Sequence, residues 1–490
     1  MLCYHAAFLV LCSPIDTRSA ARTISTHNRR GSWREAVAAF EAWEQQGGPL
    51  HGPRRATATC FVEVMKAHAR LGAAEMVLSC FGRMRAAQDL NISAVAFTIA
   101  IRACATRVLY PVALTLLSDA ADEGVPLDTV AYNAALTACS KAGQCQEAEL
   151  LLAEMRERGP RPDSISFNLA ISAASRAGEW RRALALLGEM EPAAAAATAA
   201  AARAGDGNLP ATAGVPRDVF CFASAIAACE RASQPEAALT TFRDMQAEGV
   251  AANTVAYNSA IRACATARLW PAALSLLDDM RLAQVHRSTI SYNAALVACE
   301  RGGAWEEAAV LLREMEEEGV PLDQITYHTA IACARRGGTA RSAAFATDTL
   351  GQMLRAGIEP SVIGFTGAIR ACNAARQWGA ALEAFAALER AARRPAGAAL
   401  DTVAVNEALA ACAGAGRGAE AQRLLGLLRQ QRPRALVATA ASFELAARAC
   451  RAGGEAERAR RLEATARSLR ASGPSGARGR AAKSKTELEL

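Results

Sequence analysis

The chain has 490 residues, of which 52% are hydrophobic and 5% aromatic, and its formal net charge is +7. This apolar content is ample for a core of small aliphatic side chains. No apolar run approaches the ~20 residues that a membrane-spanning helix needs, so we expect no membrane partner. The mild basic excess is compatible with an anionic partner.

The chain begins with residues 1–16, a candidate start of a targeting segment, and continues with residues 17–57, which we interpret as a degenerate first repeat. Trp33 and the run REAVAAFEAW after it have the pattern of a second helix in the repeats that follow. Residues 17–34 also contain five arginines among serines and threonines, which is typical of an organellar transit peptide. Both interpretations stay open at the level of the sequence.

From residue 58 onward one sequence pattern repeats about every 35 residues. Clear copies are TVAYNAALTACSKAG (129–143), TVAYNSAIRACATAR (254–268) and TISYNAALVACERGG (289–303). A constant period of this length is typical of a solenoid, in which each unit buries its apolar face against its neighbours. The reference position of each unit, offset 0, is an aromatic residue in all but one case: Phe61, Phe97, Tyr132, Phe167, Phe222, Tyr257, Tyr292, Tyr327, Phe365, Val405 and Phe443.

Each unit has the pattern of two helices. Offsets +3, +4 and +7, such as Ala135, Leu136 and Cys139, share one helical face, and alanine occupies +3 in ten consecutive units. An aromatic at +13 often opens the second helix, which ends near a methionine at +23. We therefore predict an all-α fold, a right-handed α-solenoid of about eleven helix-turn-helix repeats.

Nine cysteines occupy nearly the same repeat position, seven residues after the reference position or six in the case of Cys333, and no CxxC pair occurs. We interpret them as buried, reduced thiols in the core. The histidines form no ligand pattern with cysteine or carboxylate, so we expect no metal and no cofactor.

The predicted repeats cover residues 58–192 and 216–471. Between them lies a low-complexity, alanine-rich insertion at 193–215, and a basic tail at 472–490 is expected to be disordered.

Offsets +1, +5 and +9 lie on the face opposite the core by helical geometry. Offset +1 carries short polar side chains, namely Thr98, Asn133, Asn168, Asn258, Asn293, Thr366 and Asn406. A cation lies at +9 or one turn earlier: Arg70, Arg102, Lys141, Arg176, Arg231, Arg262, Arg301, Arg335, Arg370 and Arg448.

Offset −2 falls on this same side, yet it is apolar: Val95, Val130, Ile165, Phe220, Val255, Ile290, Ile325, Ile363 and Val403. Apolar groups beside amides and cations suit base stacking with phosphate neutralisation. The alternatives are that the apolar residues pack against the preceding unit and that the cations only form a solvated face.

The YN…AC…G…A…LL…M…G pattern resembles the pentatricopeptide repeat family, P type, over about residues 17–470. The resemblance implies a binder of single-stranded RNA that reads about one base per repeat. In the family, the +1 residue reads a base together with the last residue of its unit, apolar −2 residues sandwich the base, and the cation approaches phosphate.

The resemblance implies a base for seven pairs. Asn133 with Asp163, Asn168 with Asp218, and Asn293 with Asp323 imply U; Asn258 with Ser288 implies C; Thr98 with Asp128 and Thr366 with Asp401 imply G; Asn406 with Thr439 implies a pyrimidine. The pairs in the Ala223 and His328 units differ from the pairs that have an assigned base in the family, so their bases stay unassigned.

We therefore expect a monomeric, non-enzymatic protein that binds single-stranded RNA of organellar transcripts and acts in their stabilisation, processing or translation. It would reside in a chloroplast or mitochondrion and could recruit protein partners to the RNA. The alternative is a protein-binding helical scaffold that uses the same face.

Overall fold

The computed structural model describes residues 17–45, 54–87, 90, 92–191, 215–393, 400–430 and 438–471. The predicted N-terminal segment 1–16, nearly all of the insertion 193–215 and the tail 472–490 lie outside these residues. The described parts contain 24 helices and no strand, and none of these helices is long and apolar enough to cross a bilayer. The chain is all-α, as predicted.

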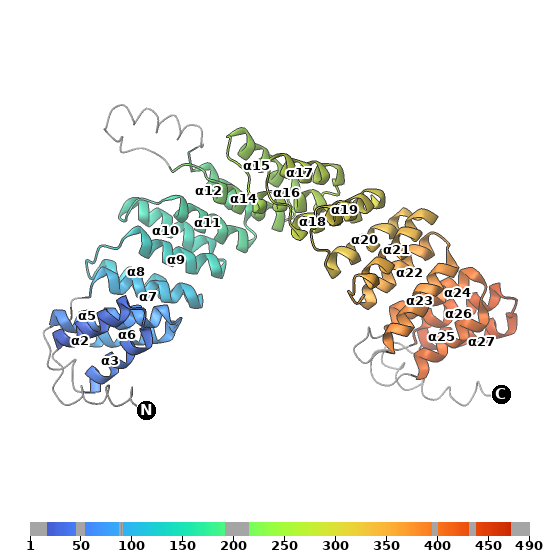
Figure 1. Ribbon diagram of the computed structural model, residues 1–490, viewed down its shortest axis with the longest axis horizontal. Helices are drawn as coiled ribbons and strands as arrows, with labels where there is room; N and C mark the ends of the chain where they lie inside the picture. The colour runs from blue at the N-terminus through green and yellow to red at the C-terminus, as the bar shows by residue number, and fades with distance from the viewer. Residues whose placement is uncertain are drawn as a thin grey trace. The chain divides into compact units, whose positions relative to one another are not determined.

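The helices form pairs in chain order, and the chain divides into two compact units, residues 1–256 and 257–490 (Figure 1). The helices of the first unit are α2 (Thr17–Arg29), α3 (Trp33–Gln45), α5 (Arg54–Arg70), α6 (Ala74–Ala86), α7 (Ala94–Arg107), α8 (Tyr110–Asp122), α9 (Thr129–Ala142), α10 (Cys145–Glu157), α11 (Ser164–Ala177), α12 (Trp180–Gly188), α14 (Val219–Arg231) and α15 (Pro235–Ala247).

Helix α16 (Thr254–Thr266) contains the boundary between the units. The helices of the second unit are α17 (Trp270–Leu282), α18 (Thr289–Gly302), α19 (Trp305–Glu317), α20 (Gln324–Gly337), α21 (Ala340–Arg355), α22 (Val362–Ala374), α23 (Trp378–Ala392), α24 (Thr402–Ala415), α25 (Gly418–Gln430), α26 (Ala440–Ala452) and α27 (Ala456–Ala471).

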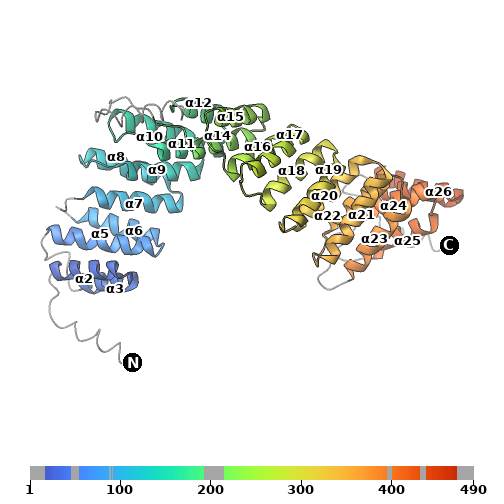
Figure 2. The same cartoon turned by 45° about the horizontal axis from the view of Figure 1, so that its top comes forward.

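Within each unit the first helices of successive repeats contact one another, and each second helix lies between its own first helix and the next one (Figure 2). In the first unit the row of first helices is α2, α5, α7, α9, α11 and α14, and in the second unit it runs through α18, α20, α22, α24 and α26. This is the stacking of an α-solenoid. The right-handed sense of the superhelix and the exact repeat boundaries stay predictions.

The small residues predicted to face the core are buried. All ten alanines at offset +3, from Ala100 to Ala446, have no exposed surface, and neither do the nine repeat cysteines. All thirteen described cysteines are free thiols, and burial raises the pKa of Cys139 to about 11 and that of Cys299 to about 12. These thiols therefore act as small packing groups that let neighbouring helices approach closely.

The second helices begin where the aromatic at +13 predicts. Tyr110, Trp180, Trp270, Trp305 and Trp378 are each the first residue of their helix. The methionines at +23 are buried, including Met84 and Met315 with no exposed surface. The repeat pattern thus located both the start and the buried stripe of the second helix.

The insertion does not interrupt the stacking of its flanking helices. Glu191 and Pro216 form an isolated parallel bridge, in which Glu191 N–H donates to Val215 O (2.8 Å) and Arg217 N–H donates to Glu191 O (2.9 Å). Helices α11 and α12 both contact α14. The two ends of the inserted segment therefore lie side by side, and α14 takes the place of the next first helix.

Candidate functional site

The first helices expose a row of apolar side chains. The nine residues predicted at offset −2 all lie at the surface, with exposed fractions from 45% for Val403 to 74% for Ile363. None of the nine is therefore buried by the preceding repeat. Leaving such groups in water costs free energy that burial would recover, so a regular row of them is a candidate contact surface.

The residue that ends each repeat is the N-cap of the next first helix. Asp128, Asp163, Asp218, Asp323 and Asp401 accept hydrogen bonds from backbone N–H groups of the first turn. Ser288 and Thr439 form capping boxes with the serine three residues later. This role satisfies orphan N–H groups of the helix and fixes the position of the polar side chain.

Two of the seven predicted pairs are joined directly. Asn133 Nδ2 donates to Asp163 Oδ1 at 3.2 Å, and Asn293 Nδ2 donates to Asp323 Oδ1 at 3.3 Å. Burial alone would raise the pKa of Asp323. Hydrogen bonds from the Thr326 backbone and hydroxyl and from Asn293 outweigh this effect and lower the pKa. Its carboxylate therefore stays ionised at neutral pH and acts only as an acceptor.

The other five pairs show no direct hydrogen bond within the described residues. In the pairs with threonine at +1, the hydroxyl donates to its own helix: Thr98 Oγ1 to Ala94 O (2.8 Å) and Thr366 Oγ1 to Val362 O (2.7 Å). The remaining three pairs are Asn168 with Asp218, Asn258 with Ser288 and Asn406 with Thr439.

Sequence reasoning missed a set of hydroxyl groups next to the asparagines. Ser166, Thr326 and Ser442 each donate to the Oδ1 atom of an asparagine in the preceding repeat, at 2.7 Å. Each lies at offset −1, directly before the buried aromatic, and has no exposed surface. The signal was available, since a hydroxyl three residues after an N-cap predicts a capping box.

The predicted cations lie on the same helices, and nine of the ten are exposed, Arg370 being half-buried. Five of the ten contact neighbouring groups. These contacts are Arg70 over the Trp33 ring, Lys141 Nζ to Ala105 O (3.0 Å), Arg231 Nη1 to Ser175 Oγ (2.8 Å), Arg335 Nη2 to Glu300 Oε1 (3.9 Å) and Arg370 Nε to Glu407 Oε1 (2.7 Å).

Four further cations have no such partner in the described part of the chain. No hydrogen bond or ion pair engages the guanidinium groups of Arg102, Arg176, Arg301 and Arg448, and all four are exposed. They follow the apolar row and the polar +1 residues along the same helix faces. We call the side of the first helices formed by offsets −2, +1, +5 and +9 the first-helix face. Two of its predicted +1 residues, Asn258 and Thr366, are buried, which departs from the exposure predicted for this offset.

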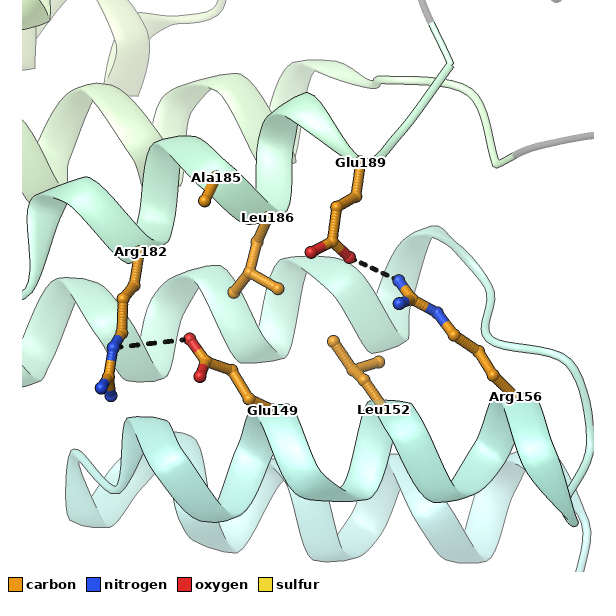
Figure 3. A pocket seen from close by; sticks show the side chains of 7 residues that line it. All are labelled: Glu149, Leu152, Arg156, Arg182, Ala185, Leu186 and Glu189. Carbon is orange, nitrogen blue, oxygen red and sulfur yellow. Dashed lines mark hydrogen bonds and ion pairs between the residues drawn. The ribbon is translucent and has the colours of Figure 1, made fainter.

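A separate hollow of about 300 Å³ lies between the second helices α10 and α12 (Figure 3). Two ion pairs cross it, Arg156 to Glu189 (2.6 Å) and Arg182 to Glu149 (3.9 Å), so its charges satisfy one another. The described residues contain no cluster of three or more metal-ligating side chains. The first-helix face is therefore the stronger candidate for a ligand site.

Comparison with known families places repeats on most of the central region. The pentatricopeptide repeat domain matches residues 214–303 and 310–374, the PPR repeat family matches residues 127–175, and the PPR repeat matches residues 165–191 and 290–320. No curated protein sequence matches the chain.

Several solved structures are similar to the chain. The pentatricopeptide repeat protein PPR10 in complex with an 18-nt psaJ RNA element is 20% identical over 94% of this chain and 66% of its own, with a TM-score of 0.43. PPR10 from maize is 19% identical over 92% and 73%, with a TM-score of 0.40. Nuclear proteinaceous RNase P 2 from A. thaliana is 18% identical over 36% and 37%, with a TM-score of 0.31. The chain thus spans just under two thirds of PPR10 in the RNA complex.

Proposed function

Because the chain is a pentatricopeptide repeat protein, we propose that it binds single-stranded RNA on the first-helix face, with about one base per repeat. We further propose that it belongs to the P type, acts on organellar transcripts without catalysing a reaction, and works as a monomer that can recruit protein partners. The exposed apolar row carries this proposal, because one exposed apolar side chain per repeat offers a stacking platform beside amides and cations.

The apolar, polar and cationic rows would contribute differently to RNA binding because of their chemistry. Stacking against residues such as Val130 and Ile290 favours every base, because each base has an apolar face. Amides such as Asn133 can donate and accept hydrogen bonds at a base edge, so they would provide the selectivity among bases. Exposed guanidinium groups attract phosphates of any sequence.

With the chain aligned N to C along RNA 5′ to 3′, the preferred site is G-U-U-n-C-U-n-G-pyrimidine, starting at the Thr98 repeat. The test compares the RNA GUUACUAGU with a scrambled RNA of the same composition by fluorescence polarisation. We expect at least about tenfold tighter binding of the matched RNA, because a mismatched base typically costs about 1–3 kcal/mol in sequence-reading proteins. Equal affinity for both would overturn base reading and favour the protein-binding scaffold.

A single substitution sharpens this test. Asn133→Thr recreates the Thr–Asp combination of the Thr98 repeat, so the second position should change its preference from U to G while the other positions keep theirs. A randomised-RNA selection on wild type and variant measures the change. Identical selected motifs would contradict the assignment of one base to one repeat.

A further inference from the structure

Asn133 belongs to a closed ring of hydrogen bonds that spans two repeats. Its Nδ2 donates to Asp163 Oδ1, and its Oδ1 lies 2.7 Å from Ser166 Oγ, whose single hydroxyl proton is shared between this atom and Asp163 Oδ1 at 2.9 Å. The ring closes through the capping box, in which Asp163 N–H donates to Ser166 Oγ (3.2 Å) and Ser166 N–H donates to Asp163 Oδ1 (2.8 Å). Both ends of the amide therefore have a partner: the carboxylate, which can only accept, and the hydroxyl, which can donate to Oδ1.

The same ring recurs in the second unit. Thr326 Oγ1 lies 2.7 Å from Asn293 Oδ1 and 2.8 Å from Asp323 Oδ1, so its proton is shared between them, and Asn293 Nδ2 donates to Asp323 Oδ1 at 3.3 Å. The hydroxyl bond has the optimal length for O–H···O, whereas the amide–carboxylate bonds lie at or beyond the long end of the N–H···O range. The contact with the hydroxyl is therefore the shorter of the two.

Hydroxyl groups reach four of the five asparagines at offset +1. Asn168 Oδ1 accepts from Ser224 Oγ and Asn406 Oδ1 from Ser442 Oγ, each at 2.7 Å. Asn258 is the exception: its Oδ1 is buried without a hydrogen-bond partner. Ser291 occupies the matching offset −1 but engages Ser288 instead, and Asn258 is the asparagine whose pair implies C.

The orientation of an amide decides between the two pyrimidines. On its Watson–Crick edge, uracil offers an N3–H donor beside the O4 acceptor, whereas cytosine offers the N3 acceptor beside an N4–H₂ donor. These patterns are opposite at both positions. An amide also has one donor end and one acceptor end, so a flip of the amide converts a partner for uracil into a partner for cytosine.

We propose that the hydroxyl at offset −1 of the following repeat, Ser166 or Thr326, is a positioning residue that selects U over C. Together with the carboxylate, which can only accept from Nδ2, the hydroxyl holds Oδ1 of the asparagine and opposes the amide flip, so that the same end of the amide meets the base. This inference rests on the proposed function, because it assigns a third residue to the base-reading pairs Asn133–Asp163 and Asn293–Asp323.

The test uses the full-length chain and two RNAs, GUUACUAGU and the same RNA with C at the sixth position, which faces Asn293. Thr326→Val removes the hydroxyl at nearly constant shape, Thr326→Ser keeps it, and Ser291→Ala removes a capping hydroxyl that does not touch an asparagine. The measured quantity is the ratio of the dissociation constants for the two RNAs.

We expect Thr326→Val to lower this ratio by about 2- to 12-fold, the equivalent of one neutral hydrogen bond, and Thr326→Ser and Ser291→Ala to leave it unchanged. A purely structural role would affect Thr326→Val and Ser291→Ala alike. If Thr326→Val does not fold, Ser166→Ala tests the same inference, with the ratio of dissociation constants measured for U and C at the second RNA position.

The experiment distinguishes failure of the proposed function from failure of this inference. Wild type that does not bind either RNA overturns the proposed function and this inference together. Wild type that binds RNA without a preference at the sixth position overturns the base reading proposed for Asn293 and this inference with it. Wild type that prefers U there, with an unchanged ratio in Thr326→Val, overturns the inference alone.

Discussion

The indole of Trp270 occupies the space into which a side chain on Gly302 would extend, because a Cβ atom there would overlap Trp270 Cδ1. The relationship recurs: a Cβ on Gly337 would lie 2.6 Å from Trp305 Cδ1, and a Cβ on Gly414 would lie 2.5 Å from Trp378 Cε2. In each case the tryptophan that opens one second helix packs on the end of the next first helix. The glycines permit this contact between repeats.

Replacing Gly302 by alanine should therefore destabilise the fold by about 1–3 kcal/mol, the usual cost of forcing extra atoms into a packed site. Urea unfolding measures the effect. The matched control is Gly426→Ala in α25, where a Cβ would meet no atom within 4 Å, and where the higher helix propensity of alanine should stabilise by about 0.5–1 kcal/mol. A Gly302→Ala protein as stable as wild type would show that the indole can move aside freely.

The cations without a partner should dominate the salt dependence of RNA binding. In the quadruple variant Arg102→Ala, Arg176→Ala, Arg301→Ala and Arg448→Ala, affinity should fall for every RNA sequence. The slope of log affinity against log salt should flatten by about 3, since each neutralised phosphate of a single strand contributes about 0.7.

The control for this prediction carries the same loss of charge on the second helices: Arg181→Ala, Arg243→Ala, Arg313→Ala and Arg390→Ala. Its slope should stay close to that of wild type. Equal slopes in the two quadruple variants would mean that net charge, and not the first-helix face, attracts the RNA.

Phe220 is the aromatic member of the exposed apolar row, with 60% of its surface accessible. Phe220→Ala should weaken RNA binding by about 1–3 kcal/mol, the usual contribution of a base stacked on an aromatic ring, while the urea midpoint stays unchanged because little buried surface is lost. Leu282→Ala is the control, since Leu282 is 77% exposed but lies at the end of second helix α17. Comparable losses of affinity in both variants would argue against a specific stacking row.

His328 should make folding sensitive to acid. Burial lowers its pKa below 6.5 in the folded state, where its Nε2 lies 3.4 Å from Ser361 Oγ. Below pH 6.5 the unfolded chain therefore binds more protons than the folded chain at this site, and stability falls as the pH falls. His328→Gln should show a smaller decrease in urea midpoint between pH 7.5 and 5.5 than wild type. An identical decrease would assign the acid sensitivity to other groups, such as His68, whose pKa burial also lowers.

Much of the fold and of the first-helix face could be predicted from the sequence. Helical periodicity is a local property, so it placed Trp270 at the start of its helix and Ile363 on the exposed side. The partners of each side chain depend on the neighbouring repeat and could not be read from one repeat alone. Helical periodicity placed Arg370 and Arg176 on the same stripe, yet Arg370 is paired with Glu407 while no hydrogen bond or ion pair engages the Arg176 guanidinium in the described part of the chain. The hydroxyl of Thr326 was missed for the same reason, because its acceptor lies 33 residues earlier.

The capping role of the last residue in each repeat restricts which residues can occupy that position. The ten residues in this place are Ser93, Asp128, Asp163, Asp218, Asn253, Ser288, Asp323, Ser361, Asp401 and Thr439. All belong to the four residue types that cap helices well, and replacing such a cap by alanine typically costs about 0.5–2 kcal/mol. Under the proposed base reading, exchanges among these four residue types would change the RNA target one nucleotide at a time with little effect on folding, whereas any other residue would weaken the helix that begins there.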